Sequence, residues 1–311
     1  MRLRWTLLLV GGVLTAGADP PTPTPPANTD ELYKLGQQLF DQYAPPEVKE
    51  QYEFPSMEQW DAFAARLQHA LENNSLEELA AYEPEARSAL VALRTIPGYG
   101  DYADWLELRI DEIEAARQAV AQQRPTSPAA PQIRRPGPEI PLYDIWLARE
   151  RARPVPPGAA ELMPRLRKAF AAEGVPSELA WLAEAESGLN PSARSPAGAT
   201  GLFQLMPGTA HNLGLGTFLP DERTDPERSA RAAAGYLRTL YDRFGSWPLA
   251  LAAYNAGEGR VSRELASRRA SDFAGVASAL PSQTRMYVPK VCALVAVRTG
   301  VEPDALPPPR A

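Results

Sequence analysis

Residues 177–188 read Ser-Glu-Leu-Ala-Trp-Leu-Ala-Glu-Ala-Glu-Ser-Gly, and this stretch decides the fold of the C-terminal half. Pro176 and Ser177 are residue types that open helices, and Gly188 is the type that most often ends one. The same start and stop residues recur through the second half, and no run of alternating apolar and polar residues interrupts them. The sequence therefore predicts a mainly α-helical C-terminal half.

One carboxylate stands out within this stretch. Positions i, i+3, i+4 and i+7 of a helix share one face, and here they are Leu179, Leu182, Ala183 and Glu186. Glu184 falls nearly opposite Leu182, so we expect it to be solvated. A carboxylate on a buried stripe is costly unless it is paired or functional, and burial raises its pKa toward that of a general acid. A salt bridge between Glu186 and an arginine is the alternative.

Two further segments extend the pattern. In residues 195–210, Thr200 is expected to cap a short helix that carries Phe203 and Gln204. Pro207 is expected to open the next helix. Residues 246–257 predict an alanine-rich helix that ends at its glycine and packs closely against a neighbour.

Four blocks together resemble the lytic transglycosylases, which are bacterial enzymes of lysozyme-like fold that cleave peptidoglycan. They are Glu186-Ser187, Gly201-Leu-Phe-Gln-Leu-Met206, Ala253-Tyr-Asn-Ala-Gly257 and Leu280-Pro-Ser-Gln-Thr-Arg-Met-Tyr-Val-Pro-Lys290. The blocks keep the order and spacing of the family and extend over residues 174–298. The resemblance implies an all-α protein, with a lysozyme-like C-terminal catalytic domain and an N-terminal α-helical domain outside the resemblance.

The resemblance also implies roles for single residues. Glu186 matches the single catalytic acid and base of the family. The residues that match its saccharide cleft and its surroundings are Ser195, Gln204, Met206, Tyr254, Asn255 and Tyr287. Among them, Ser195 matches a serine that hydrogen-bonds the carboxylate and Tyr254 a tyrosine near it. Without the resemblance, Met206 and Tyr254 equally fit a core, and Ser195 fits a turn. Gln283 departs from the family, because relatives commonly carry glutamate there.

A site with one carboxylate suits a transglycosylase, because no water has to be activated. Glu186 would protonate the oxygen between N-acetylmuramic acid and N-acetylglucosamine. It would then accept the proton of the muramyl C6 hydroxyl, which closes a 1,6-anhydro ring. No metal and no cofactor is implied. One rival is a muramidase related to goose-type lysozyme, which would need a second acid from Asp221, Asp225 or Glu258. Another is a non-catalytic cell-wall-binding or scaffold protein.

The N-terminus predicts export. A basic start, an apolar run and Ala16-Gly17-Ala18 make residues 1–18 a secretory signal peptide, and an uncleaved anchor or a buried helix is the alternative. With cleavage, we expect a periplasmic or secreted protein without a transmembrane anchor. One cysteine and two histidines argue against a disulfide scaffold and against a metal cluster. Cys292, among valines, is expected in the core.

Composition divides the rest of the chain. We expect a proline-rich tether at 19–28, an acidic helical accessory domain at 29–122, a proline-rich linker at 123–141, the catalytic domain at 142–302 and a proline-rich tail at 303–311.

The net charge of −6 hides an asymmetry. Residues 19–123 hold 20 acidic and seven basic side chains, whereas residues 124–311 hold 18 acidic and 23 basic ones. A basic catalytic half would be attracted to the carboxylates of peptidoglycan. We expect the acidic half to pack against the basic half or shield it, or to bind a basic protein partner. Nucleic acid is not an expected partner.

Overall fold

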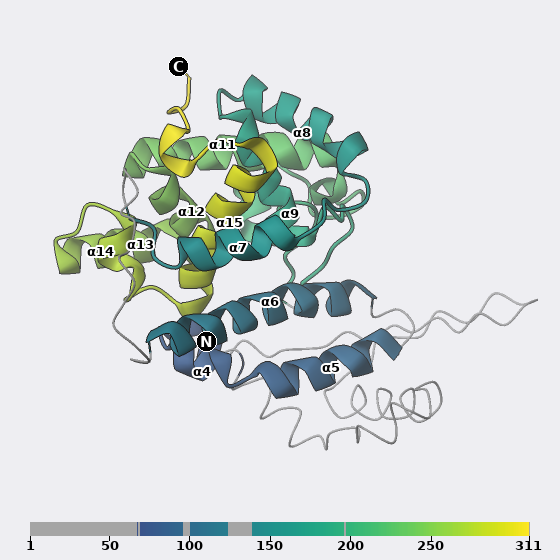
Figure 1. The fold of residues 1–311 in the computed structure, drawn as a ribbon. Helices are drawn as coiled ribbons and strands as arrows, with labels where there is room; N and C mark the ends of the chain where they lie inside the picture. Colours follow the sequence, from purple (N-terminus) through teal and green to yellow (C-terminus); the bar gives the residue numbers. More distant parts are fainter. Residues whose placement is uncertain (1–66, 68, 96–99, 124–138, 196, 311) are drawn as a thin grey trace, which may run out of the picture.

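The computed structural model describes residues 67, 69–95, 100–123, 139–195 and 197–310 (Figure 1). Within these ranges the chain is helical, and the only β pairings are isolated bridges, so the predicted all-α class is confirmed. The predicted signal peptide, the tether, most of the first predicted helices and nearly all of the linker lie outside the described residues.

The described helices fall into an N-terminal and a C-terminal group. The first group is α4 (Leu76–Ala80), α5 (Glu83–Thr95) and α6 (Gly100–Gln123). The second group is α7 (Tyr143–Ala152), α8 (Ala159–Ala172), η1 (Ser177–Trp181), α9 (Leu182–Ser187), α10 (Pro207–Asn212), η2 (Glu222–Thr224), α11 (Pro226–Phe244), α12 (Trp247–Ala256), α13 (Glu258–Arg268), α14 (Phe273–Ala277), α15 (Ser282–Thr299) and η3 (Pro303–Ala305). In the described ranges, none of these helices is long and apolar enough to cross a membrane.

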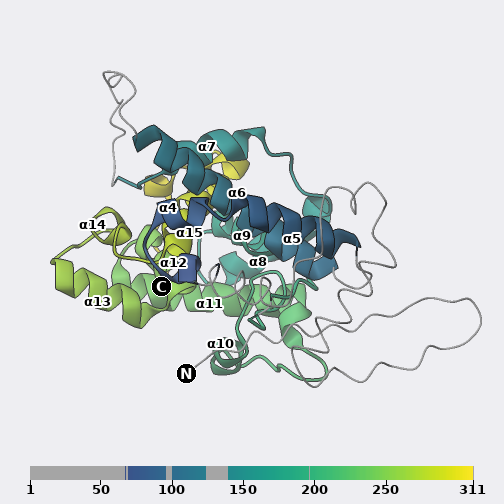
Figure 2. The same cartoon turned by 90° about the horizontal axis from the view of Figure 1, so that it is seen from below.

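Helix α15 runs through the centre of the C-terminal group, as Figures 1 and 2 show. It packs against α7, α12, α9 and η1, and its side chains from Met286 to Ala296 are all buried. A helix that is apolar nearly all round has to lie inside the protein. Cys292 is one of these buried side chains, where burial raises its thiol pKa to about 12, as expected for a core residue.

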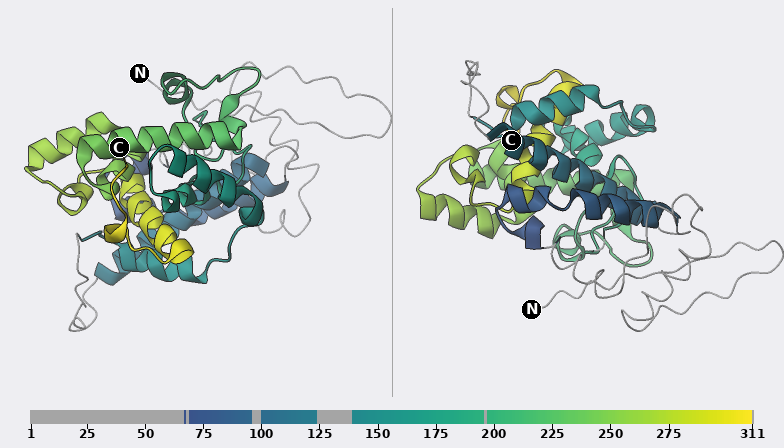
Figure 3. Two further views of the ribbon diagram at one scale, coloured as in Figure 1. Left: turned by 90° about the horizontal axis from the view of Figure 1, so that it is seen from above. Right: turned by 60° about the horizontal axis from the view of Figure 1, so that its bottom comes forward.

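The N-terminal helices form a layer along one side of the C-terminal group (Figures 1 and 3). Helix α6 lies between α5 and the C-terminal helices, and it contacts α7, α9 and α15. The backbone joins the two groups as well, because the N–H of Ser282 donates to the carbonyl of Asn73 at 2.5 Å. The Asn74 side chain also donates to the carbonyl of Ser278 at 3.1 Å. The acidic region therefore packs directly against the start of the central helix.

Several helix ends lie where the residue types place them. The Ser75 hydroxyl accepts the N–H of Glu78, and Gly188 and Gly257 follow the last residues of α9 and α12. Glu258 is the first residue of α13, because Gly257 ends one helix and directly precedes the next.

The segment before α9 differs from the expected single α-helix. Residues 177–181 form the 3-10 helix η1, and the α-helix proper begins at Leu182. The expected short helix after Thr200 is also wrong. Thr200 instead pairs with Arg194 and Leu205 in isolated bridges. A helix cannot form in between, because Gly201 and Gln204 adopt positive φ angles of 83° and 45°.

The predicted tail is joined to the C-terminal group rather than extending from it. The backbone N–H of Arg310 donates to the carbonyl of Gly174 at 2.8 Å. The indole N–H of Trp247 donates to the carbonyl of Pro307 at 3.0 Å. These bonds hold the last residues of the chain against the loop that precedes η1 and the start of α12.

Gly201 provides a test of the packing of the loop at residues 194–205. A Cβ at this position would lie 2.0 Å from the carbonyl oxygen of Arg223, whereas a Cβ at Gly198 would meet no atom within 4 Å. Both glycines have positive φ. Gly198→Ala should therefore cost about 1 kcal/mol of unfolding free energy, and Gly201→Ala about 3 kcal/mol or more. Denaturant unfolding of the two variants measures the difference, and equal losses would contradict the close packing.

Candidate active site

Glu186 lies at the C-terminal end of α9, next to the buried residues Ala185 and Ser187, and is itself partly buried. Burial raises the pKa of Glu186 from 4.5 to about 7, against the opposing effects of a tyrosine hydrogen bond and two nearby cations. A carboxyl group with this pKa is partly protonated at neutral pH. It can therefore donate a proton and accept one back, as the buried position in the sequence pattern suggested.

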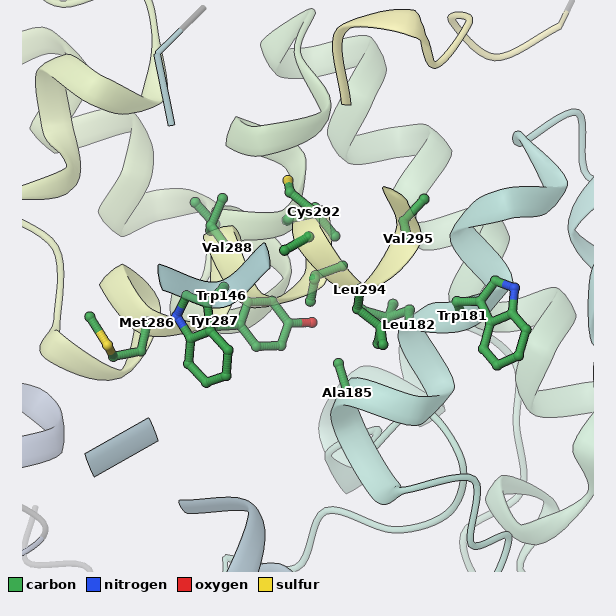
Figure 4. Close-up of a cluster of buried hydrophobic side chains, with 14 of the residues drawn as sticks. Trp146, Trp181, Leu182, Ala185, Met286, Tyr287, Val288, Cys292, Leu294 and Val295 are labelled. Atoms are coloured by element: carbon green, nitrogen blue, oxygen red, sulfur yellow. The ribbon is translucent and has the colours of Figure 1, made fainter. Parts of the chain in front are cut away.

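Tyr287 is the direct partner of Glu186. Its hydroxyl donates to the Oε1 atom of Glu186 at 2.5 Å. Figure 4 shows the Tyr287 ring beside Trp146, with its hydroxyl directed toward the helix that carries Leu182 and Ala185. Burial and the charge of Glu186 raise the pKa of Tyr287 well above its ordinary value, so the tyrosine remains a hydrogen-bond donor. The predicted site residue from the last block thus lies against the carboxylate.

Tyr254 and Ser187 hold the loop that faces Glu186. The Tyr254 hydroxyl donates to the carbonyl of Phe203 at 2.8 Å, and the Ser187 hydroxyl lies 3.0 Å from the carbonyl of Leu202. Burial and then the charge of Glu186 raise the pKa of Tyr254. Three of the sequence blocks therefore meet at Glu186, through α9, the 201–204 turn and α12.

Ser195 and Gln204 have other partners in the structure. The Ser195 hydroxyl accepts the N–H of Ala199 at 3.0 Å, and its only described hydrogen bonds lie within the loop rather than with Glu186. The Gln204 amide donates to the carbonyls of Ala193 at 3.2 Å and Gly201 at 2.9 Å. Both side chains shape the loop, and a direct role for either with a ligand stays a prediction.

Met206 and Asn255 differ in accessibility. Met206 is 42% exposed, which is unusual for a large apolar side chain and leaves it available to a ligand. The Asn255 side chain accepts the hydroxyl of Thr284 at 2.8 Å and so links α12 to α15. Gln283, where relatives commonly have glutamate, lies beside Thr284 in the first turn of α15 and is partly buried.

Glu184 corrects a sequence expectation. It is not solvated but 3% exposed, and the Arg298 guanidinium donates to its two oxygens at 2.6 and 2.9 Å. The helical wheel failed here because α9 is only six residues long and is enclosed by η1, α6 and α15. The arginine pairing considered for Glu186 therefore belongs to the glutamate two residues earlier.

The three carboxylates proposed as a second acid are engaged elsewhere. Asp221 pairs with Arg223 at 2.7 Å. Asp225 caps α11 by accepting backbone N–H groups, as its position before a proline predicted. Glu258 pairs with Arg243 at 3.0 Å. None of the three is among the groups that most affect the pKa of Glu186.

Sequence reasoning missed three charged residues near Glu186. The charges of Arg109 and Lys290 lower its pKa, and the charge of Glu112 raises it. Lys290 belongs to α15, but Arg109 and Glu112 lie on α6, within the region expected to be an accessory domain. The sequence does contain a signal for Arg109. It lies on the apolar face of its helix with Trp105, just as Glu186 lies on the apolar face of its own helix.

Comparison with known proteins agrees with this geometry. Residues 166–276 match the family model described as "Transglycosylase SLT domain". This part of the chain is therefore similar to the SLT transglycosylase domains, and the resemblance to the lytic transglycosylases drawn from the sequence blocks is confirmed. The matched range contains Glu186 and the 253–257 block, whereas Tyr287 lies beyond its end.

Two relatives come from Escherichia coli K12. The chain is 40% identical over 126 residues to membrane-bound lytic murein transglycosylase D, covering 39% of this chain and 27% of the relative. It is 41% identical over 120 residues to the soluble lytic murein transglycosylase, covering 36% of this chain and 19% of the relative. The chain thus spans less than a third of the length of either relative.

A solved structure also aligns with most of the chain. The 70 kDa soluble lytic transglycosylase of Escherichia coli covers 90% of this chain and 59% of its own, with 19% identity and a TM-score of 0.42.

The raised pKa of Glu186 gives a stability prediction. Between pH 4.5 and 7 the folded protein keeps a proton that the unfolded chain releases, so the unfolding free energy falls as pH rises. Above pH 7 the full penalty of about 3 kcal/mol remains. Glu186→Gln removes the ionisable group and should stabilise the protein by up to this amount at pH 8, and little at pH 4. Denaturant unfolding at both pH values measures the gain.

Glu184→Gln is the matched control, two residues away in the same helix. It leaves the buried Arg298 guanidinium without its anion and should cost about 3 kcal/mol at pH 8. If both variants lost stability alike at pH 8, the penalty assigned to Glu186 would be wrong.

Proposed function

We propose that this protein is a peptidoglycan lytic transglycosylase that cleaves the β-1,4 bond between N-acetylmuramic acid and N-acetylglucosamine without consuming water. One observation carries the proposal: the carboxyl group of Glu186, with a pKa of about 7, accepts the hydroxyl of Tyr287 inside a domain matched to the SLT transglycosylases. The relatives named above are described as acting on murein, and we extend that substrate to this chain.

In the first step Glu186 acts as the general acid. Tyr287 donates to the Oε1 atom, so we place the acidic proton on Oε2. Transfer of this proton to the glycosidic oxygen breaks its bond to C1 of the muramyl sugar. The departing N-acetylglucosamine leaves with a hydroxyl group, and positive charge develops at C1.

In the second step the Glu186 carboxylate acts as the base. It accepts the proton of the C6 hydroxyl on the same muramyl sugar, and the C6 oxygen bonds to C1. The product is a 1,6-anhydromuramyl end, and Glu186 is protonated again for the next cycle. The Tyr287 hydrogen bond stabilises the carboxylate between the steps, since a hydrogen bond to the charged form favours that form.

Two features favour this reaction over its rivals. A hydrolase of the inverting or retaining kind needs a second carboxylate at the cleft, and the three candidates pair with other groups in the described structure. A pure wall-binding protein would gain nothing from keeping a carboxyl group buried at a cost of about 3 kcal/mol.

The proposed location follows from the substrate. A protein acting on peptidoglycan has to be outside the cytoplasmic membrane, which agrees with the export signal expected in residues 1–18. We therefore propose a periplasmic or secreted enzyme. A protein partner for the acidic region also remains a prediction, although several acidic side chains of α6 pair within the chain itself.

Product mass tests the reaction directly. Purified sacculi digested with the protein should release muropeptides that are one water lighter than the products of a lysozyme. Glu186→Gln should abolish their release while thermal unfolding still shows a cooperative transition. Products with ordinary reducing ends would indicate the muramidase, and sacculi that are bound but not cut would indicate the scaffold protein.

A further inference from the structure

A buried cluster of three charges joins α6 to α15, the helix that carries Tyr287. The side chains of Arg109, Glu112 and Lys290 are 5%, 0% and 1% exposed. The Arg109 Nη1 atom donates to Glu112 at 2.9 Å, and the Lys290 Nζ atom lies 3.5 Å from the other oxygen of Glu112. One carboxylate therefore bridges a cation of α6 and a cation of α15.

Such a cluster is expensive as a structural element. Burying charges carries a desolvation cost, and well-packed apolar residues of similar volume often stabilise a fold equally well or better. Arg109 is not fully satisfied either, because its buried Nε atom has no hydrogen-bond partner. Apart from Glu112, it has the ring of Trp105, whose centre lies 6.0 Å from the guanidinium carbon. A role in packing alone does not explain these residues.

The cluster is joined to the site through α15 and α9, because Lys290 lies three residues after Tyr287, the donor to Glu186, and α6 contacts α9 directly. The two cations, Arg109 and Lys290, lower the pKa of Glu186, and the Glu112 carboxylate raises it. Among the described residues, the hydroxyls of Tyr287 on α15 and Tyr254 on α12 are the other groups coupled to Glu186. Among the charged groups that most affect Glu186, only Lys290 comes from outside α6.

We propose that α6 is part of the catalytic site, and that Arg109 and Glu112 are positioning residues which, with Lys290, balance the charge of Glu186 through both proton transfers. The inference rests on the proposed function, since it concerns the acid and base of that reaction.

The reaction explains why both signs of charge are present. Glu186 must be a neutral acid before the first transfer and a carboxylate before the second. Cations alone would keep Glu186 ionised, so it could not act as the acid. Burial alone would keep Glu186 protonated, so it could not act as the base. Arg109 stabilises the carboxylate and Glu112 limits that effect, so the two states remain close in free energy. The N-terminal region is then required for the chemistry and not only for binding a partner.

The charges can be removed one at a time in the full-length protein. Arg109→Met removes a cation and should raise the pKa of Glu186, whereas Glu112→Gln removes an anion and should lower it. Each shift should exceed about 0.5 pH unit. The double variant should titrate close to the wild type, because both signs are removed.

The pKa of Glu186 is measured without substrate, by NMR titration of protein with ¹³C-labelled glutamate. The carboxyl carbon resonance of Glu186 is identified as the one that is absent in Glu186→Gln. The basic limb of the pH profile of kcat/KM, measured on sacculi, should shift in the same direction as the pKa of Glu186. Arg117→Met is the matched control, because the Arg117 side chain lies on the same helix but is 64% exposed and pairs with Glu83 of α5. It should leave the titration of Glu186 unchanged.

Folding is controlled within the same set. A loosened site that admits water would lower the pKa of Glu186, so an upward shift in Arg109→Met cannot arise from loosening. If Arg109→Met does not fold, the step from Glu112→Gln to the double variant removes the Arg109 cation without leaving the Glu112 carboxylate unpaired, and the pKa of Glu186 should again rise.

The outcomes separate the two claims. The role of α6 is supported if the two single substitutions shift the pKa of Glu186 in opposite directions, or if this pKa rises from Glu112→Gln to the double variant. Shifts in the same direction, or none, overturn it even if anhydromuropeptides are released. Opposite shifts in a protein that yields no anhydro product would overturn the proposed function and leave the electrostatic coupling of α6 to Glu186 in place.

Discussion

The structure depends on a lysine that has no access to water. Lys290 lies in the middle of the central helix α15 with 1% of its surface exposed, and an ammonium group in that position requires a nearby anion. In the described part of the chain, two anions lie within ion-pair distance of its Nζ atom, Asp111 at 3.9 Å and Glu112 at 3.5 Å, and both belong to α6. The pairing therefore joins the N-terminal layer to the helix around which the C-terminal group is built.

The same pairing connects architecture to chemistry. Tyr287 and Lys290 are three residues apart on α15, so they project from one face of the helix. The tyrosine donates to Glu186, and the lysine pairs with Glu112 of α6. One face of α15 therefore positions both the Glu186 carboxyl group and helix α6. Asp111 extends the network to Arg149 of α7 at 2.5 Å. Burial would raise the pKa of Asp111, but Lys290, Arg153 and Arg149 outweigh it and lower that pKa.

This arrangement gives the charge asymmetry of the chain a structural meaning. The acidic N-terminal helices and the basic C-terminal ones are not two independent surfaces, because α6 places carboxylates against cations of α7 and α15. The opposite net charges of the two regions are partly matched inside the protein. What the remaining charge of each region attracts is a separate question, which depends on the surfaces that face solvent.

The sequence by itself determined the helical class and the ends of α9 and α12, and it indicated Glu186 as the candidate acid, because apolar periodicity and glycine stops are local properties. It did not determine the surroundings of Glu184, Ser195 or Arg109. A helical wheel assigns one buried face, whereas tertiary packing encloses α9 from several sides and pairs Glu184 with Arg298, 114 residues away. Which charges face Glu186 was likewise decided only by the docking of α6, since contacts between distant segments leave no periodic pattern in the sequence.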